Sequence, residues 1–153
     1  MSSTTIVHFD KSLTNRDTAV SFAVFCAKRA KKQWLLPMFY GCVLMKKIGL
    51  LSSKYVQLLS FRWFCPKTRS VFDNICYEFA QTVKLNDIGK KMTENKDAII
   101  VSSSLKSYVQ FVFPAHKVIA TEVKSNGHNN IIGIDYYTEK EINKVIRQEA
   151  NDD

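Results

Sequence analysis

Polar side chains with catalytic potential follow the first apolar segment of the chain. Residues 5–9 read Thr-Ile-Val-His-Phe, and Asp10 and Ser12 lie just beyond them. A short apolar run bounded by polar turn residues predicts a buried strand. The carboxylate of Asp10 and the imidazole of His8 can transfer protons, and the Ser12 hydroxyl can hydrogen-bond an anion. Two alternatives stay open: the segment is only a turn, and His8 is a packed core histidine.

A run of three serines follows a second apolar segment. Ser102, Ser103 and Ser104 come after residues 98–101 and precede a predicted helix. Ligands bind beyond the carboxyl ends of parallel strands, and hydroxyls with the N–H groups of a helix N-terminus bind anions. With positive charge from Lys140, these groups predict a phosphate pocket. The alternative is that the serines only cap the helix.

The remaining histidines and the cysteines show no metal-ligand spacing. His116 and His128 fall in predicted loops, and the four cysteines lack the C-x-x-C spacing of a zinc site. Cysteines among apolar neighbours predict reduced, mostly buried thiols in a cytoplasmic protein. We expect no signal peptide, because the first residues do not combine a basic region with an apolar stretch.

The elements that must position these residues alternate between strand and helix. We expect strands at residues 5–9, 98–101, 116–124 and 131–137, and helices within residues 16–32, 33–64, 69–96, 105–113 and 138–153. Thr138 and Glu141 have the spacing of a capping box for the last helix. The order predicts one α/β domain with a Rossmann-like parallel sheet.

The positive charge of the chain is concentrated in residues 18–72. This segment holds ten Lys and Arg residues and no Asp or Glu, whereas the rest holds 12 basic and 14 acidic residues. The net charge of +8 therefore belongs to one segment.

The same segment contains an apolar run from Trp34 to Met45, which is too short to cross a bilayer because a spanning helix needs about 20 apolar residues. One interpretation is a pair of buried helices. The other is a helical hairpin whose aromatic and basic face lies on a membrane surface. The aromatic residues lie among Leu, Val and Ile, which favours core or lipid contact over stacking on nucleic-acid bases. We therefore expect no nucleic-acid partner.

The order of these motifs resembles the haloacid dehalogenase superfamily of phosphatases. Within it, the chain resembles the phosphoserine-phosphatase-like branch and the bacterial group that includes phosphatidylglycerophosphatase C. The resemblance covers nearly the whole chain and is carried by four segments: IVHFDKSLTNRDTAVSF, AIIVSSSLKSYVQFVFP, KVIATEVK and TEKEINKVI. It implies an α/β core at residues 1–17 and 73–153 and a basic helical cap inserted at residues 18–72.

The resemblance also implies roles for the candidate residues. Asp10 would protonate the leaving group and lend its backbone carbonyl to Mg²⁺. Ser12 would lie in the turn that holds the phosphate, and Ser102, with Ser104 beside it, would bind phosphoryl oxygens. Lys140 would neutralise charge between the nucleophile and the phosphate.

Two departures from the family pattern point away from catalysis. The nucleophilic aspartate of the family falls on His8, and an imidazole is a poor ligand for Mg²⁺. The last acidic motif of the family, which follows a strand, is absent from the sequence, so the core resembles one whose C-terminal part is missing. Without that strand we expect residues 5–9 to form a sheet edge that can pair with a second copy.

The sequence thus predicts a degenerate, inactive phosphatase-like domain whose ancestral reaction is Mg²⁺-dependent phosphomonoester hydrolysis. The expected ligand is a phosphorylated small molecule or an anionic lipid head group. The alternative is a non-catalytic protein that binds phosphate or an anionic membrane surface. The expected location is the cytoplasm. If the basic helices bind a membrane, the protein is expected at its inner face.

Overall fold

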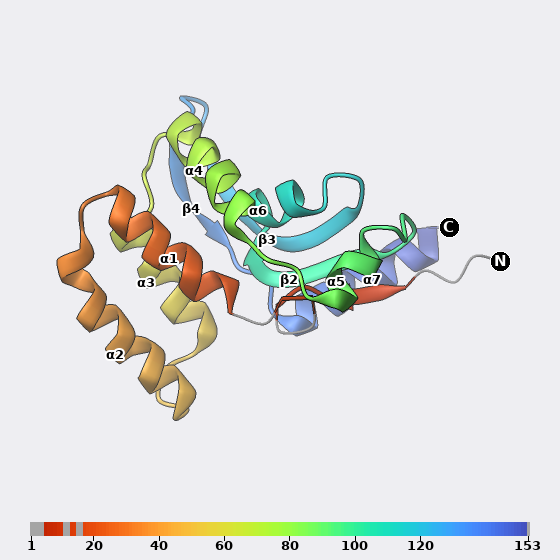
Figure 1. The fold of residues 1–153 in the computed structure, drawn as a ribbon, viewed down its shortest axis with the longest axis horizontal. Helices are drawn as coiled ribbons and strands as arrows, with labels where there is room; N and C mark the ends of the chain where they lie inside the picture. Colours follow the sequence, from red (N-terminus) through yellow and green to blue (C-terminus); the bar gives the residue numbers. More distant parts are fainter. Residues whose placement is uncertain (1–4, 11–12, 15–16, 153) are drawn as a thin grey trace.

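A computed structural model describes residues 5–10, 13–14 and 17–152. Four strands and seven α-helices follow one another along this part of the chain (Figure 1). Their bounds are β1 (Ile6–His8), α1 (Thr18–Arg29), α2 (Leu36–Lys47), α3 (Ser53–Phe64), α4 (Arg69–Thr82), α5 (Asp87–Met92), β2 (Ile99–Leu105), α6 (Lys106–Val112), β3 (Lys117–Ser125), β4 (Ile131–Asp135) and α7 (Glu139–Asp152), with a short 3₁₀ helix at Gln33–Leu35.

The strands form one sheet in the order β1-β2-β3-β4. β1 and β2 are parallel, with His8 opposite Val101, and β2 and β3 are parallel as well. β4 is antiparallel to β3, because the two are joined as a hairpin. The predicted α/β class is confirmed, and the sheet is mostly rather than entirely parallel. β1 has β2 as its one strand neighbour in the described part, so it lies at an edge as expected.

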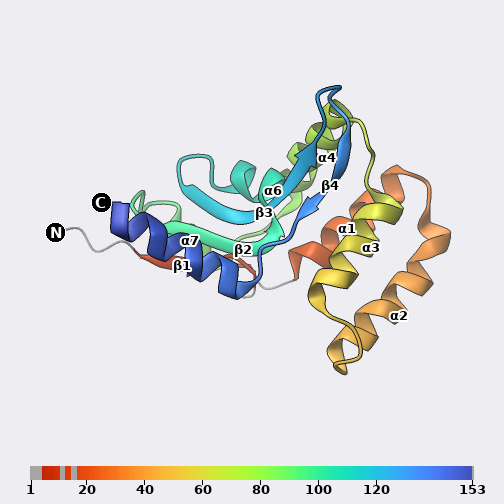
Figure 2. The ribbon, with the colours of Figure 1, turned by 180° about the vertical axis from the view of Figure 1, so that it is seen from behind.

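Helices cover both faces of the sheet, as comparison of Figures 1 and 2 shows. Alternate residues of the strands separate the two faces. Ile100 and Val118 belong to the main core cluster, together with residues of α4 and α6. Val101 and Ile119 point the other way and pack against Ile142 of α7.

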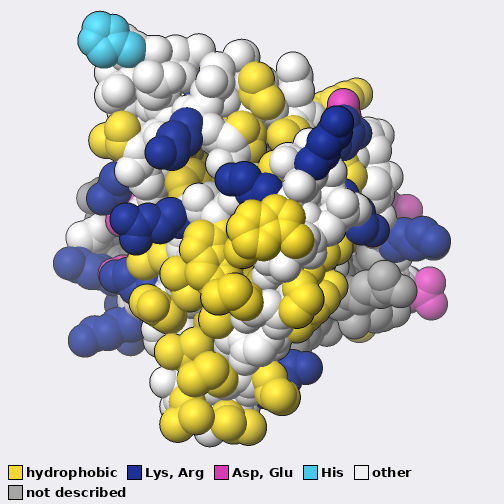
Figure 3. Space-filling view, turned by 90° about the vertical axis from the view of Figure 1, so that its left-hand side faces the viewer, with side chains coloured by type: hydrophobic (Ala, Val, Ile, Leu, Met, Phe, Trp, Pro, Cys, Tyr) yellow, Lys and Arg dark blue, Asp and Glu magenta, His cyan; other side chains and the backbone are white. Residues whose placement is uncertain are grey.

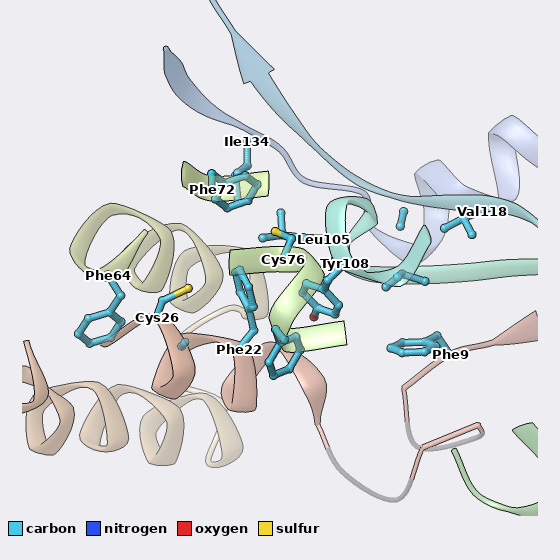
Figure 4. Packing of buried hydrophobic residues seen from close by; sticks show 14 of the residues in the cluster. Phe9, Phe22, Cys26, Phe64, Phe72, Cys76, Leu105, Tyr108, Val118 and Ile134 are labelled. Carbon is cyan, nitrogen blue, oxygen red and sulfur yellow. The ribbon is translucent and has the colours of Figure 1, made fainter. Parts of the chain in front are cut away.

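The helices α1, α2 and α3 form a helical insert after β1 and lie to one side of the sheet (Figure 1). The expected insert of residues 18–72 contains these helices and the first turn of α4. Aromatic side chains join the insert to the rest: the Phe22 ring packs edge-on against Phe72 and lies 4.8 Å from Tyr108 (Figure 4). The insert and the sheet share one hydrophobic core.

The prediction of two buried helices within residues 33–64 is only partly right. α2 and α3 do pair, but α2 fully buries only Phe39 and Val43. Its other faces carry exposed apolar side chains, among them Met38 and Leu44. The reason is geometric. One side of the α2–α3 pair packs on the rest of the insert, and no described residue covers the other side. No helix in the described ranges is long and apolar enough to cross a bilayer.

Candidate functional site at the carboxyl end of the sheet

Asp10 follows β1 and accepts four hydrogen bonds through its carboxylate. Oδ1 accepts from the backbone N–H of Thr18 at 3.0 Å and from the Thr18 hydroxyl at 2.5 Å. Oδ2 accepts from the hydroxyls of Ser102 at 2.8 Å and Ser104 at 2.6 Å. Both oxygens are thus engaged by the chain itself. The carboxylate ties together the end of β1, the first residue of α1 and the last half of β2.

The serine run does not cap a helix, and this corrects the expectation from sequence. All three serines belong to β2, which continues to Leu105. The residue that caps α6 is Leu105, which has no side-chain oxygen, and α6 has only seven residues. The serines therefore lie at the end of a strand and not in the first turn of a helix, and their binding of phosphate stays a prediction.

The serine run lies where the pairing of β2 with β3 is irregular. The register between β2 and β3 shifts between Ser102 and Leu105, as in a bulge. The Ser104 N–H donates to the Ser102 hydroxyl oxygen at 2.9 Å, which holds the two serines in a tight turn. Ser102 and Ser104 are two positions apart in the strand and therefore share a face, so both side chains reach Asp10.

A buried tyrosine extends the network beneath Asp10. The Tyr108 hydroxyl lies 3.1 Å from the Thr18 hydroxyl, and the Tyr108 side chain is fully buried. Burial raises the pKa of Tyr108 well above its usual value, and the negative charge of Asp10 raises it further; hydrogen bonds with Ser104 and Thr18 oppose part of this shift. The phenol is therefore neutral and acts as a hydrogen-bonding group.

His8 is exposed at the end of β1 and lines a cavity of about 310 Å³. The alternative of a packed core histidine is therefore wrong. Alternation along the strand explains this: Val7 packs against the core, so His8 points to the other face. Asp10, Ser102 and Tyr136 line the same cavity.

A second cavity, of about 210 Å³, lies between the end of the sheet and the helical insert. Asp10, Ser103 and Ser104 line it from the sheet side, and Lys46 lines it from α2. Further polar lining comes from α3, with Ser53, Gln57 and Ser60. Asp10, Ser103 and Tyr136 border both cavities, which therefore meet around this strand end.

The lysine of this second cavity is paired with an acid. Lys46 Nζ lies 3.6 Å from Oδ2 of Asp17, and both residues line the cavity. Asp17 is the N-cap of α1, where its Oδ1 accepts from the Ala19 N–H at 3.1 Å.

The structure brings His8, Asp10, Ser102 and Ser104 together, and the role of Lys140 stays a prediction. Lys140 is exposed in the first turn of α7 and lines neither cavity, although Ile142 of the same turn borders one. Ser12 lies outside the described residues. Lys46 was missed as a site residue, whereas Ser103 belongs to the predicted serine run. The basic segment was a signal for Lys46, but nothing in the sequence singled it out from nine other cations.

The remaining candidates have structural roles. Nε2 of His116 lies 2.8 Å from the Asn95 carbonyl oxygen and 3.0 Å from that of Met92, so this histidine fastens the turn before β2. The four cysteines are free, as predicted, with Cys26 and Cys76 buried and the other two half-buried.

The described residues do not fit Mg²⁺. This cation prefers six oxygen ligands, including one or two carboxylates. Asp10 uses both carboxylate oxygens internally, and its neighbours are hydroxyls and the His8 imidazole. Within residues 5–10, 13–14 and 17–152 no group of three or more His, Cys, Asp or Glu is arranged to hold a metal ion. The expected contact of the Asp10 carbonyl with Mg²⁺ stays a prediction.

Comparisons with known proteins identify the fold. No family model and no curated protein matches the sequence. A haloacid dehalogenase family hydrolase from Salmonella enterica serovar Typhi superposes with a TM-score of 0.65 at 10% identity, over 95% of this chain and 50% of that one. A phosphoserine phosphatase from T. onnurineus, in complex with NDSB-201, gives a TM-score of 0.63 at 13% identity, over 97% and 72%. The chain thus has a haloacid dehalogenase-like fold and spans half the length of the first structure.

Proposed function

We propose that this chain is a phosphatase-like domain that holds a phosphorylated small molecule or lipid head group and hydrolyses it slowly or not at all. The haloacid dehalogenase-like fold supports a phosphatase-like function, and the two cavities at the strand end provide space for a ligand. The state of Asp10 carries the proposal. A general acid must present a proton to the leaving group, but four hydrogen bonds from the chain hold both Asp10 oxygens as acceptors.

The position of His8 supports the same conclusion. By resemblance, this strand end carries the carboxylate that attacks phosphorus, and an imidazole stands there instead. His8 is exposed and lines the cavity, so nothing hides it from a ligand. An imidazole in place of a carboxylate that both attacks phosphorus and binds the metal removes two contributions to catalysis at once.

Ligand binding is supported by the polar lining of the cavity under the insert. The Ser103 hydroxyl has no hydrogen-bond partner among the described residues, so it is available to a ligand. Lys46 is the cation of this cavity, and its 3.6 Å contact with Asp17 is long for an ion pair. A phosphate dianion can compete with Asp17 for Lys46. The affinity is limited because two carboxylates, Asp10 and Asp17, line the same space.

Hydrolysis is tested with a chromogenic phosphate ester in the presence of Mg²⁺. We expect the chain to show no turnover above the buffer control, and His8→Asp to restore none, because the described acidic groups still do not assemble a metal site. Turnover by the unmodified chain that disappears in Asp10→Asn would contradict the proposal, since it would show Asp10 acting as a general acid.

Binding is tested with inorganic phosphate by isothermal titration calorimetry. Asp17→Asn should tighten binding by about fivefold, because it removes one negative charge and releases Lys46. Asparagine caps a helix as well as aspartate, so α1 is preserved. Lys46→Ala should weaken binding by a similar factor, whereas Lys90→Ala on the remote helix α5 should not. Equal affinity of the unmodified chain and the three variants would show that phosphate does not bind in this cavity and would contradict the proposal.

A second candidate function is a non-catalytic membrane-surface binding protein at the inner face of the membrane. It is favoured by a specific observation, the exposed apolar and basic surface of the insert.

A further inference from the structure

Exposed apolar side chains gather on the helical pair of the insert. Of the 15 large apolar side chains that are exposed in the described part of the chain, nine fall between Trp34 and Leu58. Ile48 and Leu50, in the turn between α2 and α3, are 65% and 66% exposed, and Trp34 is 74% exposed. We call the nine the hairpin patch: Trp34, Met38, Tyr40, Leu44, Met45, Ile48, Leu50, Tyr55 and Leu58. A concentration of this kind on one supersecondary unit marks a binding surface rather than scattered exposure.

Basic side chains border the hairpin patch and lack acidic neighbours. Lys47 and Lys54 flank the α2–α3 turn, both exposed, and neither has an ion-pair partner within the described ranges. Lys31 and Arg62 are exposed and unpaired in the same way. Because residues 18–72 contain no Asp or Glu, nothing on these helices offsets the positive charge.

The patch lies on a part of the molecule that projects away from the sheet. In Figure 1 the turn between α2 and α3 is the end of the insert farthest from β3 and β4. Figure 3 shows hydrophobic side chains over the centre and the projecting lower end of this face, with most Lys and Arg side chains above and to the sides of them. A convex apolar tip with a basic rim suits a broad, flat, negatively charged surface better than it suits a narrow ligand.

We propose that the hairpin patch docks on an anionic lipid bilayer. Apolar side chains of the turn enter the boundary between head groups and acyl chains, and the surrounding lysines contact acidic head groups. This inference rests on the second candidate function, for which it names the docking residues and the lipid charge, and it does not depend on the ligand of the strand-end cavity.

The charge distribution favours a bilayer over a second copy of the chain. In a symmetric dimer the same patch meets itself. That arrangement would bring Lys47 and Lys54 of both copies together without any acidic residue from residues 18–72 between them. An acidic membrane surface instead attracts these lysines, and its acyl chains take up the apolar side chains.

The docked arrangement also places the cavity under the insert close to the head groups. Lys46 in the last turn of α2 and Ser53 at the start of α3 line that cavity, and both lie next to the exposed turn. A lipid head group therefore has a short path from the bilayer to Ser103 and Asp10.

Vesicle flotation of the full chain tests the inference. The vesicles contain phosphatidylcholine alone or about one part phosphatidylglycerol to three parts phosphatidylcholine. We expect flotation only with the acidic vesicles, and weaker flotation as the Debye length falls from about 10 Å at 0.1 M to about 3 Å at 1 M salt. Brominated lipid should quench the fluorescence of a tryptophan placed in the α2–α3 turn by Leu50→Trp more strongly than the fluorescence of the unmodified chain.

Matched variants separate the patch from general surface effects. Ile48→Glu should weaken vesicle binding by at least about tenfold. Ile132→Glu, on β4 and equally exposed at 66%, should leave it unchanged. Lys47→Gln with Lys54→Gln should weaken it by about thirtyfold, since one cation near an acidic surface contributes about fivefold. Lys90→Gln with Lys91→Gln on α5 is the matched charge control.

Three results would overturn the inference. The first is absence of flotation, and the second is flotation that ignores lipid charge and salt. The third is equal loss of binding in Ile48→Glu and Ile132→Glu. A dimer in sedimentation velocity that Ile48→Glu dissolves, with no vesicle binding, would assign the patch to a second copy instead. Absence of phosphate binding in the strand-end cavity would not change the vesicle result. The two proposals can therefore be contradicted independently.

Discussion

At the scale of single residues, Asp10 is the point where three segments meet. Its carboxylate joins the end of β1 to Thr18 of α1 and to two serines of β2. Four hydrogen bonds reach its two oxygens, and hydrogen bonds to a charged acceptor are the stronger class. The residue with the strongest catalytic pattern in the sequence is therefore also a structural link between insert and sheet.

Asp10→Asn should lower the free energy of unfolding by about 1–3 kcal/mol, because an amide nitrogen cannot accept the hydrogen bonds that one carboxylate oxygen now receives. Urea denaturation checks this value. Asp135→Asn on β4 is the control, because Asp135 is exposed, and we expect a change below about 0.5 kcal/mol there. Equal stability of Asp10→Asn and the unmodified chain would contradict the structural role.

The buried Tyr108 hydroxyl should make the free energy of unfolding depend on pH. Its pKa is raised in the folded chain by burial, so at alkaline pH the unfolded chain loses the phenol proton while the folded chain keeps it. This contribution to stability is complete below pH about 10 and declines as pH rises further, by about 1.4 kcal/mol per pH unit. Urea denaturation from neutral to alkaline pH measures the free energy of unfolding. In Tyr108→Phe this free energy should decline less steeply with pH than in the unmodified chain. Tyr40→Phe, at an exposed tyrosine, should keep the slope of the unmodified chain.

At the scale of elements, the short helix α5 supports the turn that follows Asp10. The Asn86 N–H donates to the Leu13 carbonyl oxygen at 2.9 Å, and the Asn86 side chain caps α5 through the Gly89 N–H at 2.8 Å. Gly89 packs so closely on that turn that a Cβ would lie 2.7 Å from the Leu13 carbonyl oxygen. The glycine is thus required by contact between two elements.

Gly89→Ala should destabilise the fold by about 1–3 kcal/mol, because backbone has to move to relieve the overlap. Gly41→Ala is the matched variant: Gly41 lies inside α2 and a Cβ there meets nothing within 4 Å. It should stabilise the chain by about 0.5–1 kcal/mol, because alanine is the better helix former. Thermal unfolding of both variants provides the comparison, and a stabilising effect of Gly89→Ala would be inconsistent with the packing.

At the scale of the whole molecule, β1 is the exposed edge of the sheet. It pairs with β2 alone in the described part, and Ile6 is 42% exposed. An apolar edge strand offers unpaired N–H and C=O groups to another chain. Dimerisation through this edge therefore stays a proposal that the topology allows.

Ile6→Lys should reduce self-association, because a lysine on an edge strand opposes pairing with a second copy. Sedimentation velocity at increasing protein concentration measures the effect. Ile132→Lys, on β4 at the opposite edge, is the control and should leave the association of β1 edges unchanged. Association that is equal in both variants and the unmodified chain would exclude β1 as the contact.

The sequence by itself determined the class of fold and the places of most elements. Periodicity of apolar residues located the strands and helices, and the capping box was confirmed, with the Thr138 N–H donating to Glu141 at 2.9 Å and the Glu141 N–H donating to the Thr138 hydroxyl at 3.2 Å. These features depend on neighbours within one helical turn or strand, so local sequence carries them. The cluster of His8, Asp10 and the serines also followed from motif order.

Tertiary structure alone decided what those residues do. The serine run looked like a helix cap, but pairing with β3 and the bulge drew it into β2, where it meets a carboxylate 92 and 94 positions away in the chain. Lys46 and Ser103 line the same cavity because helices of the insert pack over the strand end. One side of α2 is exposed because no described residue packs against it. Contacts over such sequence distances have no local signal, so only the folded chain shows them.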